Sequence, residues 1–130
     1  MAFNKNPYMN YANAKVETSS QGDLLVMLYD AAIRFVKEIE THILAKDIGK
    51  KGMAVDNAFA VLNELQYSIN YEHDIKLANN LNNLYNFITG EISKANMNNI
   101  AEKIAPVIIV IEKLKAGWVA VNNDLKKSGI

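Results

Sequence analysis

The sequence feature that most constrains the fold is the spacing of apolar residues in the last quarter of the chain. These residues recur at intervals of alternately three and four positions, as they do along the buried seam of a helix in a bundle. The seam comprises Ile104, Val107, Ile111, Leu114, Trp118, Val121 and Leu125. A helix with such a seam must pack against other helices, so we predict a helix over residues 99–126 within a helical bundle.

Three earlier segments show the same periodicity and predict helices over residues 20–44, 53–70 and 75–95. The first opens with Ser20 and Asp23, which fit a capping box at a helix N-terminus. Short polar connections separate the segments: Lys46–Gly52, which contains two glycines, and Tyr71–Asp74. Short connections between amphipathic helices favour antiparallel neighbours. We therefore predict an all-α fold, an antiparallel four-helix bundle spanning residues 19–127.

Two features of the last helix leave alternatives open. Asn99, with Glu102 three residues later, can cap its N-terminus, but Pro106 lacks a backbone N–H, so the helix either bends or begins there. The run Val107–Ile111 would read as a buried strand in isolation. A single strand would find no partner in this chain, and a helix is therefore preferred.

Residues 1–18 are polar, rich in asparagine and interrupted by Pro7, without helical or strand periodicity. We interpret them as an extended N-terminal arm. The arm carries Tyr8 and Tyr11, two aromatic side chains that could cover an apolar surface of the bundle.

Composition excludes several functional classes. Fourteen basic and fourteen acidic residues cancel, so the basic surplus that nucleic-acid binding requires is missing. The chain has no cysteine, and therefore no disulfide, thiolate metal site or cysteine nucleophile. No apolar run is long enough to insert into a membrane or to act as a secretory signal, which predicts a cytoplasmic protein.

Residues with catalytic or metal-binding chemistry are few. Neither His42 nor His73 follows a glutamate at the spacing of a di-iron bundle site, and Glu72, His73 and Asp74 occupy a turn that points them apart. We expect no metal, no cofactor and no enzymatic activity. One alternative is histidine phosphotransfer through His42, but its predicted position in the last helical turn is explained by the helix dipole.

The first predicted helix carries more apolar surface than one core contact requires. Val26, Met27 and Ile33 lie beside or within its polar face. Either this helix is buried nearly all round, or the surplus belongs to a binding groove. A groove of this kind could be covered by Tyr8 and Tyr11 until a partner displaces the arm. An adaptor or regulator that binds a partner helix would have the same features.

These residues resemble the N-terminal signature of the FliS family of flagellar secretion chaperones. The family pattern has two tyrosines in the arm, followed by Leu-Leu-x-Met-Leu-Tyr-Asp; the corresponding residues are Asn6–Tyr8, Tyr11 and Leu24–Asp30. Asn80-Leu81, Leu84-Tyr85, and Leu114 with Trp118 match later family positions. At one departure, Asp74-Ile75 replace a usual Gly-Gly, which implies a stiffer connection.

The resemblance implies a chaperone that binds the disordered C-terminal segment of flagellin, prevents premature polymerisation and presents flagellin to the export gate of the flagellar type III apparatus. Such binding couples folding of the partner to burial in a groove. We expect Tyr8, Tyr11, Val26, Met27, Tyr29, Ile33 and Tyr85 to form the binding surface or its cap. Tyr29 and Tyr85 could equally be core residues, since a buried hydroxyl needs only a polar partner.

Overall fold

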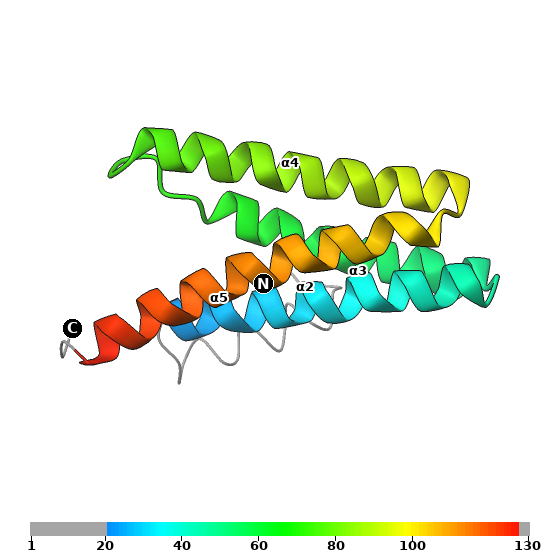
Figure 1. Ribbon diagram of the computed structural model, residues 1–130, viewed down its shortest axis with the longest axis horizontal. Helices are drawn as coiled ribbons and strands as arrows, with labels where there is room; N and C mark the ends of the chain where they lie inside the picture. Colours follow the sequence, from blue (N-terminus) through cyan, green and yellow to red (C-terminus); the bar gives the residue numbers. More distant parts are fainter. Residues whose placement is uncertain (1–20, 128–130) are drawn as a thin grey trace, which may run out of the picture.

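The computed structural model describes residues 21–127, which form four long helices and one short 3₁₀ turn. The helices are α2 (Gln21–Leu44), α3 (Ile48–Tyr67), α4 (Ile75–Asn98) and α5 (Ile104–Lys127), with η1 (Ala101–Lys103) before α5. Successive helices run in opposite directions (Figure 1), which confirms the predicted all-α bundle. The run Val107–Ile111 is helical, as preferred from the sequence. The predicted arm, residues 1–18, lies outside the described residues.

The core is a continuous column of aliphatic side chains from all four helices. Its largest fully buried members, each at most 1% exposed, include Ile39, Leu62, Leu65, Ile88, Ile92, Ile104 and Ile111. Full burial of one such side chain contributes roughly 1.5–3 kcal/mol to the free energy of folding. The predicted stripes therefore supply the packing that holds the bundle together.

The predicted start of the second helix at residue 53 is wrong, because α3 begins at Ile48. Helix α2 ends with Lys46 in the left-handed conformation (φ 58°), and the N–H of Asp47 donates to the carbonyl of His42 at 3.0 Å. Asp47 then caps α3 by accepting the N–H of Lys50 at 3.0 Å. This tight reversal is shorter than the predicted turn Lys46–Gly52. The first turns of α3 contain two glycines, which disfavour a helix, and the cap stabilises the helix there. The same helix ends at Tyr67 rather than at residue 70.

The boundaries around residue 99 also differ from the prediction. Asn99 does not cap the last helix; it adopts the left-handed conformation (φ 52°) that terminates α4, which extends past residue 95 to Asn98. Helix α5 begins at Ile104, after η1, so the prediction of a start at residue 99 is wrong. Pro106 lies in the first turn of α5, where its missing N–H would have had no partner within the helix. Of the two alternatives, the helix therefore begins near the proline.

Hydrogen bonds from polar side chains, as well as apolar packing, hold helix α4 against α3. The amide nitrogen of Gln66 donates to Asn82 at 2.7 Å and to Asn86 at 2.9 Å. The ammonium group of Lys51, a buried residue, donates to the carbonyl of Asn96 at 3.0 Å and to the side chain of Asn99 at 2.7 Å. These bonds explain why a helix so rich in asparagine, a weak helix former, is stable in this position.

Replacement of Lys51 by methionine tests the contribution of this buried ammonium group. We expect Lys51→Met to lower the free energy of unfolding by about 2 kcal/mol, because the variant keeps the apolar stem but loses two charge-assisted hydrogen bonds at the α4 C-terminus. Denaturant unfolding measures the change. The neighbouring Lys50→Met, at an exposed position, should shift stability by less than about 0.5 kcal/mol. Equal effects of the two variants would contradict the assignment.

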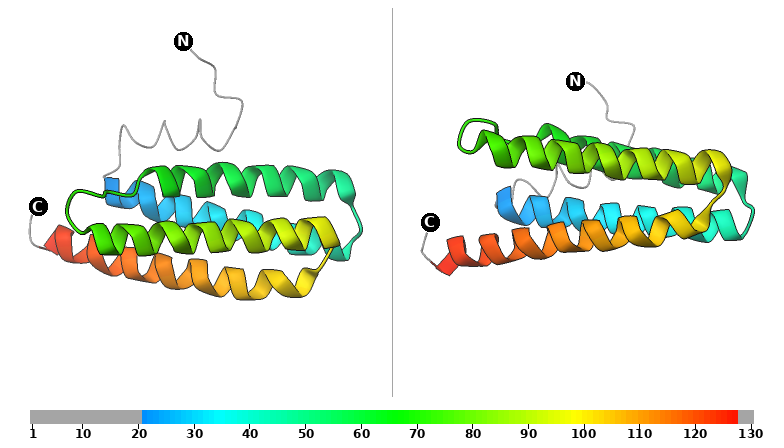
Figure 2. Two further views of the ribbon diagram at one scale, coloured as in Figure 1. Left: turned by 90° about the horizontal axis from the view of Figure 1, so that it is seen from above. Right: turned by 45° about the horizontal axis from the view of Figure 1, so that its top comes forward.

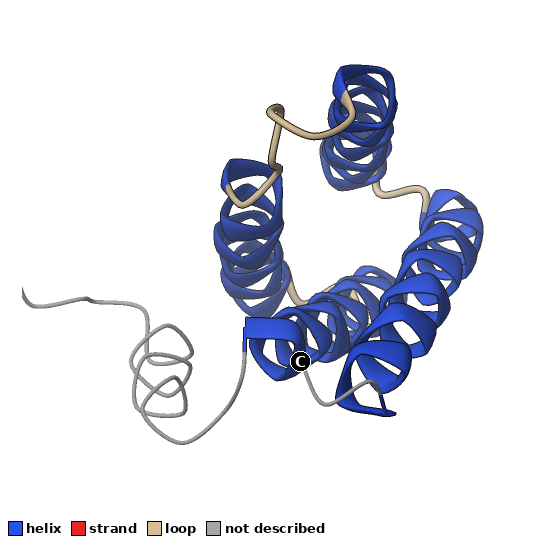
Figure 3. Cartoon of the chain, turned by 90° about the vertical axis from the view of Figure 1, so that its left-hand side faces the viewer, coloured by secondary structure: helices blue, strands red, loops and turns tan. Residues whose placement is uncertain are grey.

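Helices α4 and α5 lie close together near η1 and separate toward their other ends (Figure 1 and Figure 2). Figure 3 looks along the bundle from the end at which α4 begins and shows the four helices arranged in a ring. Because α4 diverges from α5, a groove opens between the two helices.

Candidate binding groove

An apolar groove with a volume of about 290 Å³ runs between the N-terminal half of α4 and the C-terminal half of α5. Leu77 and Leu81 lie one turn apart on α4, and residues on three successive turns of α5 face them. Gly117 contributes no side chain to this wall, and a Cβ added there would meet no atom of another helix within 4 Å. The residues that line the groove are Leu77, Leu81, Lys113, Leu114, Gly117, Trp118 and Val121.

The groove is open because the seam of α5 continues past the helices that would cover it. Helix α3 ends at Tyr67. In the connection from α3 to α4, residues Tyr71–Asp74 are exposed. Helix α5 continues to Lys127. Val121 and Leu77 therefore retain about half of their side-chain exposure, and Trp118 is only partly buried. An apolar surface with this shape is typical of a binding site for another chain.

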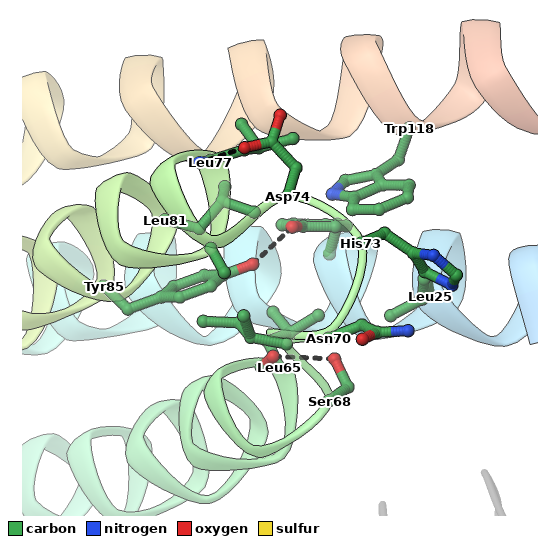
Figure 4. Close-up of a pocket in the computed structure, with 13 residues that line it drawn as sticks. Leu25, Leu65, Ser68, Asn70, His73, Asp74, Leu77, Leu81, Tyr85 and Trp118 are labelled. Atoms are coloured by element: carbon green, nitrogen blue, oxygen red, sulfur yellow. Dashed lines mark hydrogen bonds between the residues drawn. The ribbon is translucent and has the colours of Figure 1, made fainter.

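A deeper cavity of about 160 Å³ adjoins the groove and shares Leu77, Leu81 and Trp118 with it (Figure 4). The hydroxyl groups of Tyr29, on α2, and Tyr85, on α4, form a short hydrogen bond at this cavity. Figure 4 shows the nitrogen-bearing side of the Trp118 ring turned toward the hydroxyl of Tyr85. The cavity thus combines apolar walls with polar groups, which include Ser68, Asn70, His73 and Asp74 as well as the tyrosine pair.

Burial raises the pKa of Tyr29 above its ordinary value of 10.0, an effect that hydrogen bonding to Tyr85 and Trp118 partly offsets. Burial also raises the pKa of Tyr85, and the nearby Tyr29 raises it further by charge repulsion and by their hydrogen bond. Both hydroxyl groups consequently stay protonated well above neutral pH. They act as neutral hydrogen-bonding groups in the cavity.

A second hollow, broad and shallow with a volume of about 760 Å³, lies between α2 and α5 on a different surface. Its apolar part is formed by Ile33, Ala116, Val119 and Ala120, and charged side chains surround it, including Asp30, Lys37, Glu112 and Lys115. Lys115 pairs with Asp30 across the hollow at 2.5 Å. Because this ion pair is substantially exposed, it contributes little to stability.

The structure divides the predicted binding residues among different places. Tyr29 and Tyr85 are almost fully buried and line the deep cavity. Ile33 lines the shallow hollow, whereas Val26 and Met27 are partly exposed on α2 and line none of these three spaces. Tyr8 and Tyr11 lie outside the described residues. A binding role for these seven residues stays a prediction.

Sequence reasoning missed the groove because it assigned Leu114, Trp118 and Val121 to the core seam of the last helix and Leu77 and Leu81 to that of the third. Periodicity shows which residues share a face, but not whether another helix covers that face along its whole length. One signal was available. The seam continues to Val121 and beyond, whereas the apolar stripe of the second helix ends at Ile69, which leaves the last turns short of partners.

The two histidines lie apart from each other. His73 lines the deep cavity, whereas His42 lies in the last turn of α2, at the opposite end of the bundle. Among residues 21–127, no three histidine, aspartate or glutamate side chains are grouped so as to hold a metal ion. No helix within the same residues is both long and apolar enough to cross a bilayer.

Comparison with known proteins decides the family. The family model described as flagellar protein FliS matches residues 4–125, nearly the whole chain. The chain belongs to the FliS family. The resemblance inferred from the tyrosine-bearing arm and the Leu24–Asp30 motif is thereby confirmed.

Individual members of the FliS family show the same relationship. The flagellar secretion chaperone FliS of Campylobacter jejuni is 29% identical over 117 residues, which cover 90% of this chain and 91% of that protein. The chaperones of the same name from Bacillus subtilis and Salmonella typhimurium are 25% identical over 114 residues and 26% identical over 113 residues. These matches cover 88% and 83% of this chain and 84% of each relative.

A solved structure shares the fold of this FliS family member. The crystal structure of a bacterial flagellar chaperone superposes with a TM-score of 0.75 and covers 91% of this chain and 99% of that one. Sequence identity is 16%, so this likeness supports the fold alone. The bundle described above is therefore shared with a flagellar chaperone despite extensive sequence divergence.

Proposed function

We propose that this protein is a cytoplasmic export chaperone that binds the disordered C-terminal segment of flagellin, prevents its premature polymerisation and delivers it to the flagellar type III export apparatus. Membership of the FliS family supports the chaperone function, because the relatives are named flagellar secretion chaperones. The observation that carries the proposal is the uncovered apolar groove between α4 and α5. A chaperone needs such a surface to hold an unfolded chain.

The groove suits an amphipathic segment that folds as it binds. Ordering a disordered segment costs several kcal/mol, which burial of apolar surface must offset. Leu77, Leu81, Trp118 and Val121 offer large apolar side chains, and Lys113 at the edge adds a basic group beside them. The apolar face of a flagellin helix would replace water along this groove, as in other helix-in-groove complexes.

The α2–α5 hollow provides a second place for the same partner. Ile33 lies in this hollow, and Val26 and Met27 add partly exposed apolar surface to α2. A long segment that continues from the α4–α5 groove onto this surface would wrap around α5, which lies between the two. Contact with a component of the export gate would then use surface that flagellin leaves free.

Isothermal titration calorimetry with the C-terminal segment of flagellin from the same organism tests the proposal. We expect saturable binding at micromolar concentrations or tighter, with a negative heat-capacity change from apolar burial. A shuffled segment of equal composition is the control. A folded protein that binds neither segment would contradict flagellin as the partner, and equal binding of unrelated amphipathic helices would favour a general helical adaptor.

The role of the arm is tested by deletion of residues 1–17. If Tyr8 and Tyr11 cover the groove in the free protein, the deletion should raise affinity for the flagellin segment several-fold and increase binding of a hydrophobic dye, because the partner no longer competes with the arm. The substitutions Tyr8→Ala and Tyr11→Ala in the full chain should reproduce part of the effect. Unchanged affinity and dye binding in all variants would refute the capping role.

A further inference from the structure

In the deep cavity, the two tyrosine hydroxyl groups offer one more hydrogen than the cavity has acceptors for. Tyr29 and Tyr85 are 1% and 2% exposed, and the bond between their hydroxyl groups uses only one of the two hydroxyl hydrogens. Trp118 cannot accept the other hydrogen, since an indole N–H only donates. One nearly buried donor therefore has no acceptor among residues 21–127.

Three polar side chains around the cavity, those of Ser68, Asn70 and Asp74, are engaged with the backbone, and no hydrogen bond within residues 21–127 joins the fourth, His73, to either tyrosine. The hydroxyl of Ser68 donates to the carbonyl of Leu65 at 2.7 Å. The side-chain oxygen of Asn70 accepts the N–H of Glu72 at 2.8 Å, and that of Asp74 accepts the N–H of Leu77 at 3.0 Å. These bonds stabilise the α3–α4 connection and the start of α4. The remaining tyrosine hydrogen is therefore available to a ligand.

The cavity has the size and walls to receive one apolar group. Its volume, about 160 Å³, is close to the roughly 150 Å³ of engineered apolar protein cavities that bind a benzene ring. Six of its thirteen lining residues are leucine, isoleucine or alanine, and three more are tyrosine or tryptophan. The polar remainder includes His73 and Asp74 but neither lysine nor arginine, so the negative charge of Asp74 would disfavour a carboxylate. The ligand should combine an apolar body with a neutral acceptor.

We propose that this cavity is a receptor pocket for one leucine- to phenylalanine-sized side chain of a partner, with a neutral carbonyl oxygen beside that side chain accepting the free hydrogen of the Tyr29–Tyr85 pair. The pocket opens beside the α4–α5 groove and shares three lining residues with it, so a segment in the groove can insert one side chain. The assignment of flagellin as the source of that side chain rests on the proposed function. The size of the pocket and its free hydroxyl hydrogen are properties of the structure and do not depend on the proposed function.

A pair of small probes with the same shape tests the pocket without any partner. Cyclohexanone carries a carbonyl oxygen where methylenecyclohexane carries a CH₂ group. Trp118 is the only tryptophan, so its single indole N–H resonance and its fluorescence report on this pocket. Both probes should perturb Trp118 saturably, the ketone with about five- to tenfold higher affinity, and cyclohexanecarboxylate should bind worst. Absence of any saturable change would mean that the cavity holds only water and would overturn the proposal.

Two variants separate shape from hydrogen bonding. The double variant Tyr29→Phe, Tyr85→Phe keeps the rings and removes both hydroxyl groups, so its affinity for the ketone should fall toward its affinity for methylenecyclohexane. Ala78→Leu fills the cavity and should abolish binding of both. If Ala78→Leu fails to fold, Ser68→Phe, at an exposed position on the cavity wall, serves as the blocking variant. An undiminished ketone preference after loss of both hydroxyl groups would overturn the role of the tyrosine pair.

Competition then connects the pocket to flagellin. A flagellin segment that binds should displace cyclohexanone, and replacement of a single one of its large apolar residues by alanine should abolish displacement while some binding remains. If the segment binds without displacing the probe, its assignment to this pocket is wrong while the proposed function stands. If the probe binds and the segment does not, the pocket stands and the proposed function fails.

Discussion

The double variant Leu77→Glu, Val121→Glu is expected to weaken binding of the flagellin segment by about a hundredfold or more. Each residue lies on a different wall of the α4–α5 groove and is about half exposed, 53% for Leu77 and 48% for Val121. A glutamate at either position must lose water when the apolar face of the partner docks, which costs about 1.5–3 kcal/mol per site. Every 1.4 kcal/mol corresponds to a factor of about ten in the dissociation constant.

A matched control exists on the same two helices. Ile75 and Ile109 are as exposed as the groove residues, 64% and 52%, but neither lines the groove. The double variant Ile75→Glu, Ile109→Glu adds the same two negative charges as Leu77→Glu, Val121→Glu and also replaces two exposed aliphatic side chains. It should bind within about threefold of the unaltered protein, because surface substitutions away from a contact have small effects. Both double variants should keep the thermal stability of the unaltered protein. Equal losses of affinity in the two variants would show that flagellin does not use this groove.

The second large effect is expected at alkaline pH. Tyr29 and Tyr85 have raised pKa values in the folded protein, whereas unfolded tyrosine titrates near pH 10. Above pH 10 the unfolded chain loses these two protons while the folded protein keeps them, so stability is complete below pH 10 and falls as pH rises. The two groups together should remove about 2.7 kcal/mol of unfolding free energy per pH unit once the unfolded tyrosines are ionised.

Denaturant unfolding between pH 8 and pH 12 measures this loss. The chain has six tyrosines, so tyrosinate absorbance of the folded protein should also show two that ionise at higher pH than ordinary tyrosines. The variant Tyr29→Phe, Tyr85→Phe should show a shallower decline above pH 10 and near-parental stability at pH 8, since both partners of one hydrogen bond are removed together. Parallel pH profiles for parent and variant would contradict the raised pKa values.

Much of the fold could be predicted because helical periodicity is a local property of the sequence. Four segments had apolar residues on one face, and the structure has helices in all four, with four internal boundaries misplaced. Three of those errors, at the start of α3, the end of α4 and the start of α5, had one cause. Capping depends on which conformation a polar residue adopts, and Asp47 and Asn99 act at helix ends that residue type alone did not distinguish.

The candidate site was less predictable. The apolar residues in excess of the core stripe, Val26, Met27 and Ile33, pointed to α2 as the binding surface, but the structure has an open apolar groove between α4 and α5. Trp118 looked like a core residue and instead lies at the junction of the groove and the cavity. Its surroundings depend on how far α4 diverges from α5, and no local pattern reports that divergence.

The helical class, the balance of charge and the family could be read from the amino-acid sequence, because periodicity, composition and motif spacing do not depend on how the helices pack. The hydrogen bond between Tyr29 and Tyr85, 56 positions apart and beside a cavity, could be seen only in the folded structure. The folded structure also shows which apolar residues remain uncovered. Whether an apolar face becomes core or groove depends on the position of the neighbouring helix, and that position results from packing of the whole bundle.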